Sequence, residues 1–324
     1  MNKPLFEPSV ITNEQFNLMN IPEREIIYTT PGGKQVVRFA LGTGEKKRSY
    51  IYKPLTNLEL AGREDWVYRH LLPHLQLRYP RMLAQSAERD PESRWAIFED
   101  VGEQSHHHPT DILIQAAEDI QQLHRIPVTM LNQSFSAQKP SLSEVADQVI
   151  VHNDRLAALL VQLGMPSAVV DGLTRLMNAG LSDFADETVI CHGDLHLGNI
   201  GEFNGQAVIL DWEHVHANSV YWDLFNLLDM THPDFRRQTA PETRASVLEA
   251  YLTVRRKEEG WSGSSRDFIR HYYLFAALYS AWMLLLIDSD LTAGRWNREG
   301  LLAQQEETFS ALESCAYPLL DHNY

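Results

Sequence analysis

The amino-acid sequence predicts an α+β protein in two parts, a small antiparallel β-sheet with one helix followed by a larger and mainly helical part. Two features carry this prediction. Short runs rich in β-branched and aromatic residues, separated by turn residues, occupy residues 24–101. Helical periodicity then dominates the rest of the 324-residue chain, except for a strand-rich interruption at 189–210. We therefore expect an N-terminal domain of residues 1–101 and a C-terminal domain of residues 102–324.

The N-terminal sheet is predicted from apolar runs at residues 25–30, 36–41, 50–53 and 95–98. The first two runs flank Pro31-Gly32-Gly33-Lys34, which favours a hairpin turn because proline and glycine adopt the backbone angles that tight turns need. Residues 57–76 carry apolar side chains at three- and four-residue intervals, and this spacing predicts a helix between the third and fourth strands.

The C-terminal part is predicted to be helical from the same periodicity. One helix carries an apolar stripe formed by Ile112, Ala116, Ile120 and Leu123. Ser141 and Glu144 have the spacing of a capping box, which marks the start of another helix. Two long segments, residues 267–287 and 298–315, are expected to complete this part.

The charge balance limits the classes of partner. The chain has 43 acidic and 28 basic side chains, which gives a formal net charge of −15. Nucleic acids and anionic membrane surfaces are bound through clustered lysine and arginine, so neither is expected as the main partner. The negative charge is compatible with a cationic small ligand, although a solvated acidic surface is the simpler explanation of most of these residues.

Cysteine usage and the N-terminus predict a cytoplasmic protein. Cys191 and Cys315 lie far apart and lack the spacing of metal ligands, so a reducing compartment is expected. Residues 1–10 have no apolar core of the kind that a signal peptide needs. The longest uncharged apolar run, residues 272–287, is short for a membrane span and is interpreted as a buried helix.

The residues that suggest chemistry lie in the strand-rich interruption. A short apolar run at 189–191 leads into His192-Gly193-Asp194, and Asn199 follows five residues after Asp194. Each of these residues is also common in ordinary turns. Their occurrence together at this spacing favours a functional loop.

A hairpin is predicted directly after this loop. Asn204-Gly205 separates two apolar runs, which is a strong hairpin signal because both residues tolerate positive φ. The hairpin would bring Asn199, before its first strand, opposite Asp211, after its second. Carboxylate and amide oxygens are hard ligands of the kind that bind Mg²⁺ carried by a nucleotide.

This motif resembles the catalytic core of the aminoglycoside phosphotransferase and choline kinase families, which are relatives of the protein kinases. The resemblance implies a bilobal protein-kinase-like fold, in which residues 1–101 bind the nucleotide and residues 102–324 hold the catalytic loop and the acceptor site. It implies a kinase that uses ATP and Mg²⁺ to phosphorylate a hydroxyl of a small molecule. Asp194 would accept the hydroxyl proton, while Asn199 and Asp211 would hold Mg²⁺ on the ATP phosphates.

The resemblance also implies residues that bind the nucleotide. Lys53, on the third predicted strand, and Glu64, on the next helix, resemble the lysine–glutamate pair that holds the lysine against the α- and β-phosphates. Gly32 and Gly33 lie where the nucleotide-positioning loop of the family belongs. They lack the Gly-x-Gly-x-x-Gly pattern of protein kinases, so a plain hairpin turn explains them equally well.

Further positions are assigned to the inter-lobe hinge and to support of the loop. The segment that includes Glu99 and Val101 resembles the hinge, whose backbone would bind adenine. Asp223 matches a family aspartate that braces the catalytic loop through backbone hydrogen bonds, and His192 is interpreted as a second supporting residue. Glu213 could reach the metal or the substrate, although a solvated loop glutamate fits the sequence equally.

The acceptor side has two competing interpretations. Acidic side chains could bind a polyamine such as an aminoglycoside, and tryptophans could form an aromatic cage for a quaternary ammonium such as choline. The acidic set is Asp229, Asp234, Asp288 and Asp290, and the aromatic set is Trp212, Trp222, Trp282 and Trp296. Helix-surface charges and core aromatics are the alternatives. Choline, ethanolamine and thiamine kinases therefore stay open beside an aminoglycoside kinase.

The sequence disfavours several other classes of protein. A protein kinase is disfavoured, because residues 212–222 are too few for an activation segment between Asp211 and Asp223. His106-His107-His108 suggests a metal site, but no companion ligand has suitable spacing, so an exposed loop is expected. A catalytically silent nucleotide-binding module, or a structural protein with this fold, would be expected to lack some of the residues that a kinase needs.

Overall fold

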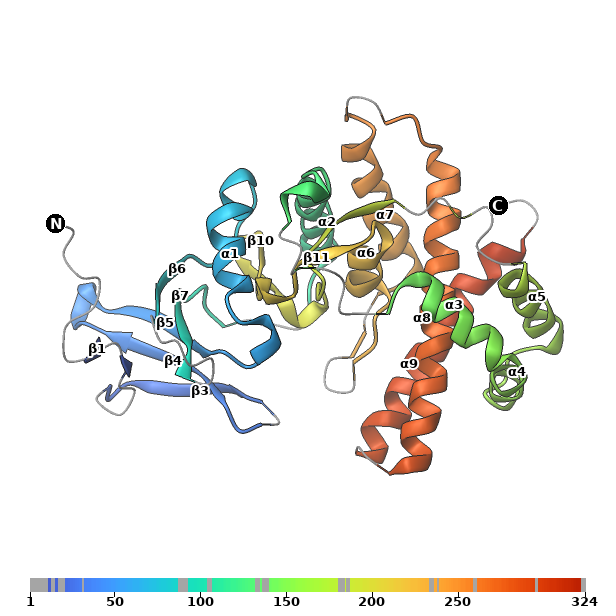
Figure 1. Ribbon diagram of the computed structural model, residues 1–324, viewed down its shortest axis with the longest axis horizontal. Coiled ribbons are helices and arrows are strands. Elements are labelled where there is room, and N and C mark those ends of the chain that lie inside the picture. Colours follow the sequence, from blue (N-terminus) through green and yellow to red (C-terminus); the bar gives the residue numbers. More distant parts are fainter. Residues whose placement is uncertain are drawn as a thin grey trace. The chain divides into compact units, whose positions relative to one another are not determined.

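A computed structural model describes residues 11–12, 15–16, 21–30, 32–86, 93–103, 107–131, 135, 140–179, 184, 187–232, 236–237, 239–258, 261–294 and 297–321. The chain forms two compact units, one made of Met1–Gln104 and Gly201–His214, the other of Ser105–Ile200 and Val215–Tyr324 (Figure 1). The sequence placed residues 201–214 in the C-terminal part. They join the first unit because the Ile209 amide donates to the Arg78 carbonyl (3.0 Å) and the Arg78 guanidinium stacks on Phe203 (4.1 Å to the ring centre).

The first unit is built on an antiparallel sheet. Within the described residues its strands run in the order β3-β4-β5-β7-β6. Their bounds are β3 Arg24–Thr29, β4 Gln35–Leu41, β5 Arg48–Pro54, β6 Met82–Gln85 and β7 Trp95–Glu99. The four predicted strands are confirmed, and β6 was missed because Met82–Gln85 is short and contains no β-branched residue. One face of the sheet buries Ile21, Phe39, Trp95 and Ile97 in a common core. Two further short strands, β1 Ile11–Thr12 and β2 Gln15–Phe16, pair with each other.

The predicted helix at residues 57–76 is wrong in its extent. The segment consists of a 3₁₀ turn at Leu58–Leu60, helix α1 at Arg63–His70 and another 3₁₀ turn at Leu72–His74. Gly62 adopts φ +84° and separates the first two pieces, and Pro73 lies in the first turn of the last one. Proline and a left-handed glycine both interrupt regular helical hydrogen bonding. The break leaves Glu64 in the first turn of α1.

A hairpin joins β9 (Ile200–Phe203) to β10 (Gln206–Ile209), as predicted. Asn204 and Gly205 have φ angles of +54° and +74°. Positive φ at both central residues defines the type I′ turn that matches the twist of paired strands.

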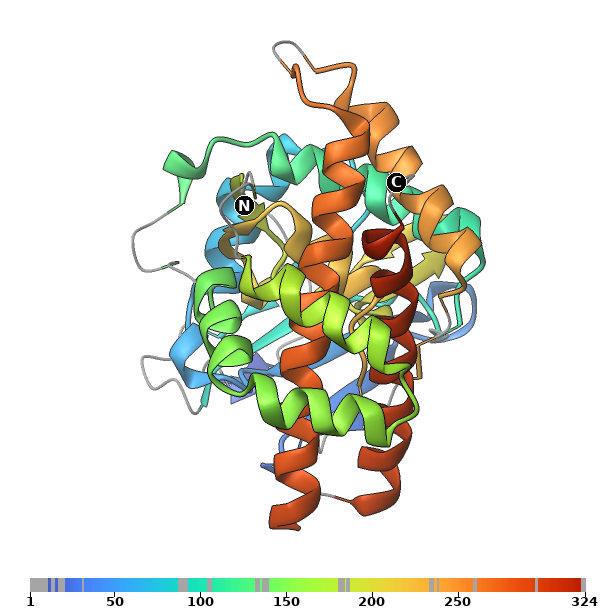
Figure 2. The same cartoon turned by 90° about the vertical axis from the view of Figure 1, so that its right-hand side faces the viewer.

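The second unit is mainly helical, as predicted. Its helices are α2 Thr110–His124, α3 Leu142–Val151, α4 Asn153–Gln162, α5 Ser167–Asn178, α6 Tyr221–Leu228, α7 Pro241–Arg255, α8 Ser265–Ala293 and α9 Arg298–Leu320. α8 and α9 pack side by side along much of their length (Figure 2). The capping box at Ser141 and Glu144 is present at the start of α3. β8 (Thr188–Cys191) pairs with β11 (His216–Ser219), a strand that the sequence did not predict.

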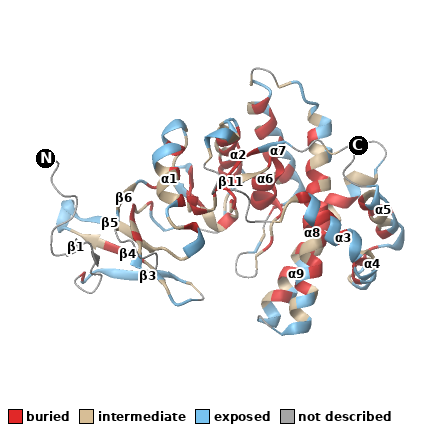
Figure 3. Cartoon of the chain, in the orientation of Figure 1, coloured by how far each residue is buried: buried red, intermediate tan, exposed pale blue. Residues whose placement is uncertain are grey.

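Among the described residues one helix, α8, is long and apolar enough to cross a membrane by length and composition alone. In its most apolar 18-residue window, 56% of the residues are buried within the structure. The buried residues of α8 include Tyr272, Phe275 and Tyr279. α6 is buried along its whole length (Figure 3), and Phe225 of α6 contacts Phe275 and Tyr279 of α8. This packing agrees with the predicted buried helix.

Candidate active site

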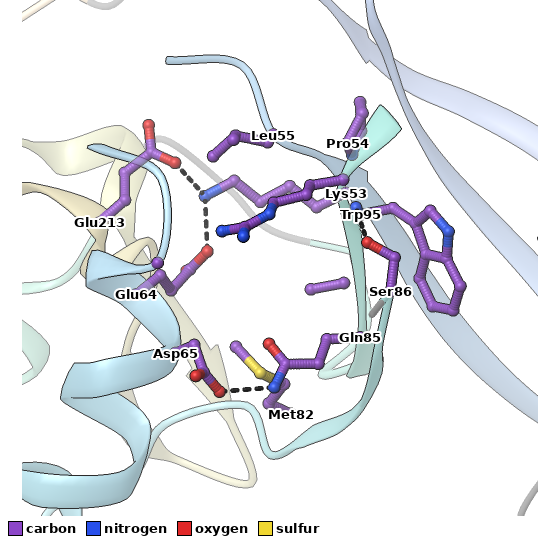
Figure 4. A pocket seen from close by; sticks show the side chains of 13 residues that line it. Lys53, Pro54, Leu55, Glu64, Asp65, Met82, Gln85, Ser86, Trp95 and Glu213 are labelled. Carbon is purple, nitrogen blue, oxygen red and sulfur yellow. Dashed lines mark hydrogen bonds and ion pairs between the residues drawn. The ribbon is translucent and has the colours of Figure 1, made fainter. Parts of the chain in front are cut away.

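The first unit concentrates charge around Lys53. This lysine lies on β5, whose strand register places it opposite Ala96 of β7. Among the described residues, carboxylate oxygens of three side chains approach its ammonium nitrogen: Asp211 at 2.6 Å, Glu213 at 3.1 Å and Glu64 at 3.4 Å. Figure 4 shows Glu64 and Glu213 reaching Lys53 from α1 and from the segment after β10. The predicted lysine–glutamate pair is therefore present, and it is joined by Asp211.

The backbone at Asp211 is strained. Its φ of +59° lies in the left-handed region, which residues other than glycine seldom adopt. Asp211 follows β10 by two positions and precedes a 3₁₀ turn at Trp212–His214. Strain of this kind persists only where surrounding contacts impose it, and here the short ion pair with Lys53 supplies such a contact.

The mutual pairing sets the protonation of this cluster. Burial alone would lower the pKa of Lys53, but Asp211, Glu64 and Glu213 outweigh it and hold that pKa well above its usual value. Burial raises the pKa of Glu64 to about 7 against the opposing effect of Lys53. Burial acts in the same direction on Glu213, but Lys53 and His214 lower the pKa of that residue to about 2. The lysine is thus a permanent cation that faces more negative charge than it can neutralise.

The burial of Glu213 contradicts one alternative drawn from the sequence. A solvated loop glutamate is wrong, because the residue is 4% exposed and pairs with both Lys53 and His214. The neighbouring Trp212 is fully buried and donates its indole N–H to the Ile209 carbonyl at 3.0 Å. Packing of Trp212 holds the turn that carries Asp211 and Glu213, and leaves this tryptophan unsuited to an exposed aromatic cage.

A cavity of about 200 Å³ lies beside Lys53 within the first unit (Figure 4). Polar side chains of Glu64, Asp65, Gln85 and Arg94 line it together with Lys53. Gln85 donates to Asp65 at 2.6 Å, which ties α1 to β6 across the floor of the cavity. This hydrogen bond holds α1, and with it Glu64, against the sheet.

The predicted phosphate turn and hinge both lie in the first unit. Between β3 and β4, the Gly33 amide donates to the Thr30 carbonyl at 2.8 Å, and Gly33 has φ +80°. Gly32 is part of the same tight turn, and Pro31 lies outside the described residues. Lys34 then donates its ammonium group to the Leu55 carbonyl at 2.8 Å, which holds the turn toward the end of β5.

The hinge segment is held by an arginine that the sequence did not single out. Arg38 of β4 donates to the Asp100 carboxylate and to the Gly102 carbonyl, each at 2.9 Å. Glu99 ends β7 and accepts from Arg81 at 3.2 Å, while Val101 is buried. These contacts fix the backbone of the segment that the sequence assigns to the hinge.

The second unit holds the His192-Gly193-Asp194 loop. It follows the buried strand β8, and Gly193 needs its glycine because φ is +90°. Asn199 donates its side-chain amide to the carbonyl of Asp194 (2.8 Å) and to the carboxylate of Asp194 (3.3 Å). The amide nitrogen is therefore directed at Asp194, so the side-chain oxygen of Asn199 is the atom that could ligate a metal.

Asp223 supports this loop from α6. It is fully buried and accepts the backbone N–H groups of His192 at 2.7 Å and Gly193 at 3.0 Å. The next peptide group is held as well, because the Trp222 indole donates to the Gly193 carbonyl at 3.0 Å. His192 is also fully buried, and its Nδ1 accepts from the Asp194 amide at 3.3 Å. These contacts are what a residue that supports the loop should make.

Two histidines near the loop were missed. His196 accepts the Gly198 amide at Nδ1 (3.0 Å) and places Nε2 at 3.7 Å from the Asp194 carboxylate. His124, on α2, reaches Asp223 at 3.2 Å. His196 lies inside the motif and could have been noticed there. The sequence of α2 contains no signal for His124 beyond its place at the end of an apolar stripe.

Other residues considered for the acceptor or a metal are engaged elsewhere. Asp229 is buried against Arg244, Arg237 and Tyr272, and Trp222 is a core residue. Asp288 pairs with Arg155, and Trp282 donates to Gln148. Asp290, near the end of α8, is partly exposed. Of the two described histidines before α2, His107 is exposed and His108 is partly exposed and contacts the Leu197 carbonyl. His106, Asp234 and Trp296 lie outside the described residues.

The sequence that forms this fold and this loop matches a protein-family model. The model of the phosphotransferase enzyme family (APH) matches residues 28–261, which is more than half of the chain. The chain belongs to this family. The match covers both the Lys53 cluster and the Asp194 loop.

A relative with curated function and several solved structures agree with this membership. Choline kinase B1 of Caenorhabditis elegans is 35% identical over 98 residues, a match that spans 26% of this chain and 26% of that protein. Choline kinase from Cryptosporidium parvum is similar in structure, with a TM-score of 0.57, 14% identity and coverage of 97% of this chain and 94% of the other. An aminoglycoside phosphotransferase from Alicyclobacillus acidocaldarius has a TM-score of 0.55, 14% identity and coverage of 99% and 98%. Amicoumacin kinase in complex with AMP-PNP, Ca²⁺ and Ami has a TM-score of 0.54, 15% identity and coverage of 94% and 91%. At these identities the structures establish the protein-kinase-like fold.

Proposed function

We propose that the protein is a kinase of small molecules, which transfers the γ-phosphate of ATP to a hydroxyl group of a cationic acceptor with the help of Mg²⁺. The observation that carries the proposal is the 2.6 Å ion pair between Lys53 and Asp211, together with Glu64 at 3.4 Å from the same lysine nitrogen. A lysine held in this way is suited to bind phosphate oxygens, which would take the place of some of the carboxylate oxygens that now contact its ammonium group.

The nucleotide is assigned to residues of the first unit. Lys53, oriented by Glu64, would pair with the α- and β-phosphates. The Gly32-Gly33 turn would cover the phosphates, and the backbone at Glu99 and Val101 would bind the adenine base. Glu213 would keep Lys53 and the turn at Asp211 in register. In this assignment residues 1–101 act together with the segment that carries Asp211.

The phosphoryl transfer is assigned to the loop of the second unit. Asp194 would orient the acceptor hydroxyl and accept its proton, while Asp223 and His192 hold the loop. Asn199 and Asp211 would ligate Mg²⁺, since an amide oxygen and a carboxylate are both hard oxygen donors. When bound, the ion neutralises charge on the transferred phosphate. Residues 102–324 would also form the acceptor site.

A choline-type acceptor is the second candidate, and the partial similarity to choline kinase B1 favours it. Trp212 and Trp222 do not support this candidate as cage residues, because both are core residues. Asp229 likewise does not favour an aminoglycoside, because its charge is used by arginines. Ethanolamine and thiamine are further alcohols to test. A catalytically silent module is disfavoured by the presence of Lys53 and Asp194 together. The acidic composition and reduced cysteines fit a cytoplasmic enzyme that binds neither nucleic acid nor membrane.

The proposal is tested by a coupled assay of ADP release with aminoglycosides, choline, ethanolamine, thiamine and sugars as acceptors. We expect Mg²⁺-dependent turnover with at least one acceptor, and a loss of roughly 10²- to 10⁴-fold in kcat for Asp194→Asn, since general-base catalysis contributes about that factor. Asp147→Asn, at an exposed position of α3, is the control for loss of one negative charge. Wild-type protein without turnover on the whole panel, or full activity in Asp194→Asn, would refute the proposal.

A further inference from the structure

A continuous chain of buried hydrogen bonds leads from the Gly193 peptide to α7. Asp223 accepts from the backbone of His192 and Gly193, and its carboxylate also contacts His124 Nε2 at 3.2 Å. His124 Nδ1 lies 2.8 Å from the hydroxyl of Tyr251, and that hydroxyl lies 3.0 Å from the Arg255 guanidinium. Arg255 finally pairs with Glu187, which directly precedes β8. All these residues belong to the second unit.

The interior of the chain is shielded from water. Asp223 and Tyr251 are fully buried, Arg255 is 3% exposed and His124 is 7% exposed. Burial of polar groups is costly unless they have partners. Within the described residues the Asp223 carboxylate, both His124 nitrogens, the Tyr251 hydroxyl and the two terminal nitrogens of Arg255 have them, whereas Arg255 Nε has none. The aromatic ring of Tyr251 also packs edge-on against His124 and stacks on Phe268.

The donors and acceptors of the chain point in one direction. Arg255 can only donate, so the Tyr251 oxygen accepts from it and donates its own proton onward to His124 Nδ1. The proton of a neutral His124 is thereby assigned to Nε2, where it donates to Asp223. The Asp223 carboxylate then accepts from both backbone amides of the loop. Burial alone would raise the pKa of Asp223, but the hydrogen bonds that the carboxylate accepts from His124 and the Gly193 amide act against burial, and the pKa is lowered, so the acceptor stays ionised.

A metal site explains this cluster less well. His124, Cys191 and Asp223 bring possible ligand atoms within 4.8 Å of one another. Cys191 donates to the Ser219 carbonyl at 3.4 Å, and both nitrogens of His124 have partners in the chain of hydrogen bonds. A metal ion would have to break several of these bonds.

We propose that Tyr251 is a positioning residue for the phosphoryl transfer. Acting through His124 and Asp223, its hydroxyl fixes the Gly193 peptide and therefore the position of the adjacent Asp194 carboxylate. Arg255 extends this control to Glu187 at the start of β8, so that both ends of the segment from β8 to the loop are tied to α7. The inference rests on the proposed function insofar as it assigns the reaction to Asp194.

The first test compares two tyrosines. Tyr251→Phe keeps the ring and removes the hydroxyl, and we expect kcat to fall roughly 3- to 10-fold, the effect of one hydrogen bond, with KM for nucleotide and acceptor unchanged. Tyr272→Phe is the matched control, because Tyr272 is also fully buried and donates to a carboxylate, that of Asp229, at 2.6 Å. It should lower stability without lowering kcat. Equal losses of kcat in the two variants would overturn the proposal.

The second test asks whether Tyr251 acts through His124. In His124→Gln the amide nitrogen can still donate to Asp223, but the ring nitrogen Nδ1 that accepts from the tyrosine hydroxyl is removed. Tyr251→Phe should therefore have no further effect on kcat in this background. Additive losses would show that the tyrosine acts by another route and would overturn the proposal.

A third measurement separates this proposal from the proposed function, because it needs no turnover. Hydrogen exchange of the His192 and Gly193 amides should be at least about threefold faster in Tyr251→Phe than in the wild type, and unchanged in Tyr272→Phe. Unchanged exchange in Tyr251→Phe would refute the positioning role, even if the kinase assay succeeds. Faster exchange in a protein without kinase activity would support the network and refute only the assignment of the reaction.

Discussion

Single residues in this protein carry several roles at once, and Lys53 is the clearest case. It is proposed to bind phosphate, yet in the structure it is also the counter-charge of three carboxylates. The sequence could predict Lys53, Glu64 and Asp211, because their order and element types resemble those of kinases. It could not predict the burial of Glu213, since a residue in a turn after a strand has no neighbouring periodicity that shows which side is covered. The same holds for Tyr251, whose hydroxyl partners come from distant parts of the chain.

The two roles of Lys53 can be separated by substitution. Lys53→Met should abolish detectable nucleotide-dependent turnover and lower the free energy of unfolding by about 3 kcal/mol, because it leaves buried carboxylates without a cation. Adding Glu213→Gln should restore much of the stability and none of the turnover. Urea unfolding and the coupled assay measure both effects. Recovery of activity in the double variant would show that Lys53 serves the fold alone.

The helices, strands and turns that position the site residues could be predicted only in part from the sequence. Periodicity predicted most of the helices, and the Asn204-Gly205 turn was confirmed down to its positive φ angles. The helix at 57–76 was overextended, because apolar spacing continued through Gly62 and Pro73 although both residues interrupt the helix. The strands β6 and β11 were missed because short segments with few β-branched residues gain their pairing from tertiary contacts.

Helix α2, which carries His124, also carries a carboxyl group with an unusual titration. Burial, with a smaller effect of Glu118, raises the pKa of Asp119 to about 7 from an ordinary value near 3.8. The folded state therefore binds this proton more tightly than the unfolded state, and the resulting stability is present below about pH 4 and lost as the pH rises through 7. Asp119→Asn cannot ionise and avoids that loss.

We expect Asp119→Asn to gain about 1–2 kcal/mol in free energy of unfolding relative to wild type between pH 4.5 and pH 8. This is less than the full linkage value, because the side chain keeps some contact with water. Urea unfolding at the two pH values measures the difference, and Asp147→Asn controls for the change of net charge. A difference that is the same at both pH values would contradict the assigned titration.

At the scale of the whole molecule, sequence and structure agree on an antiparallel sheet followed by a mainly helical part, within the phosphotransferase family. The segment of residues 201–214 is the exception, because its carboxylates complete the charge cluster of the first unit. No local sequence pattern shows that residues 201–214 pack with the first unit, because the ion pair between Lys53 and Asp211 joins residues that are far apart in the sequence.

Ligand binding should stabilise the whole molecule in a metal-dependent way. At a hundred times its dissociation constant, a non-hydrolysable ATP analogue with Mg²⁺ should add about 2.7 kcal/mol to the free energy of unfolding. Removal of Mg²⁺ with EDTA should abolish most of this gain, as should Asp211→Asn. Thermal unfolding with and without the metal measures the effect. A gain that survives both EDTA and Asp211→Asn would argue against a metal held by Asp211.

The return of the chain to its first unit also has a consequence for biosynthesis. The sheet strands end at Glu99, but Asp211 leaves the ribosome only about 110 residues later, roughly 5–20 s at the usual rate of about 5–20 residues per second. During that interval the nascent first unit has Lys53 and Glu64 without the other two carboxylates. A fragment that stops near residue 101 would resemble this early intermediate, whereas attaching residues 201–214 to it would supply the missing ion pairs.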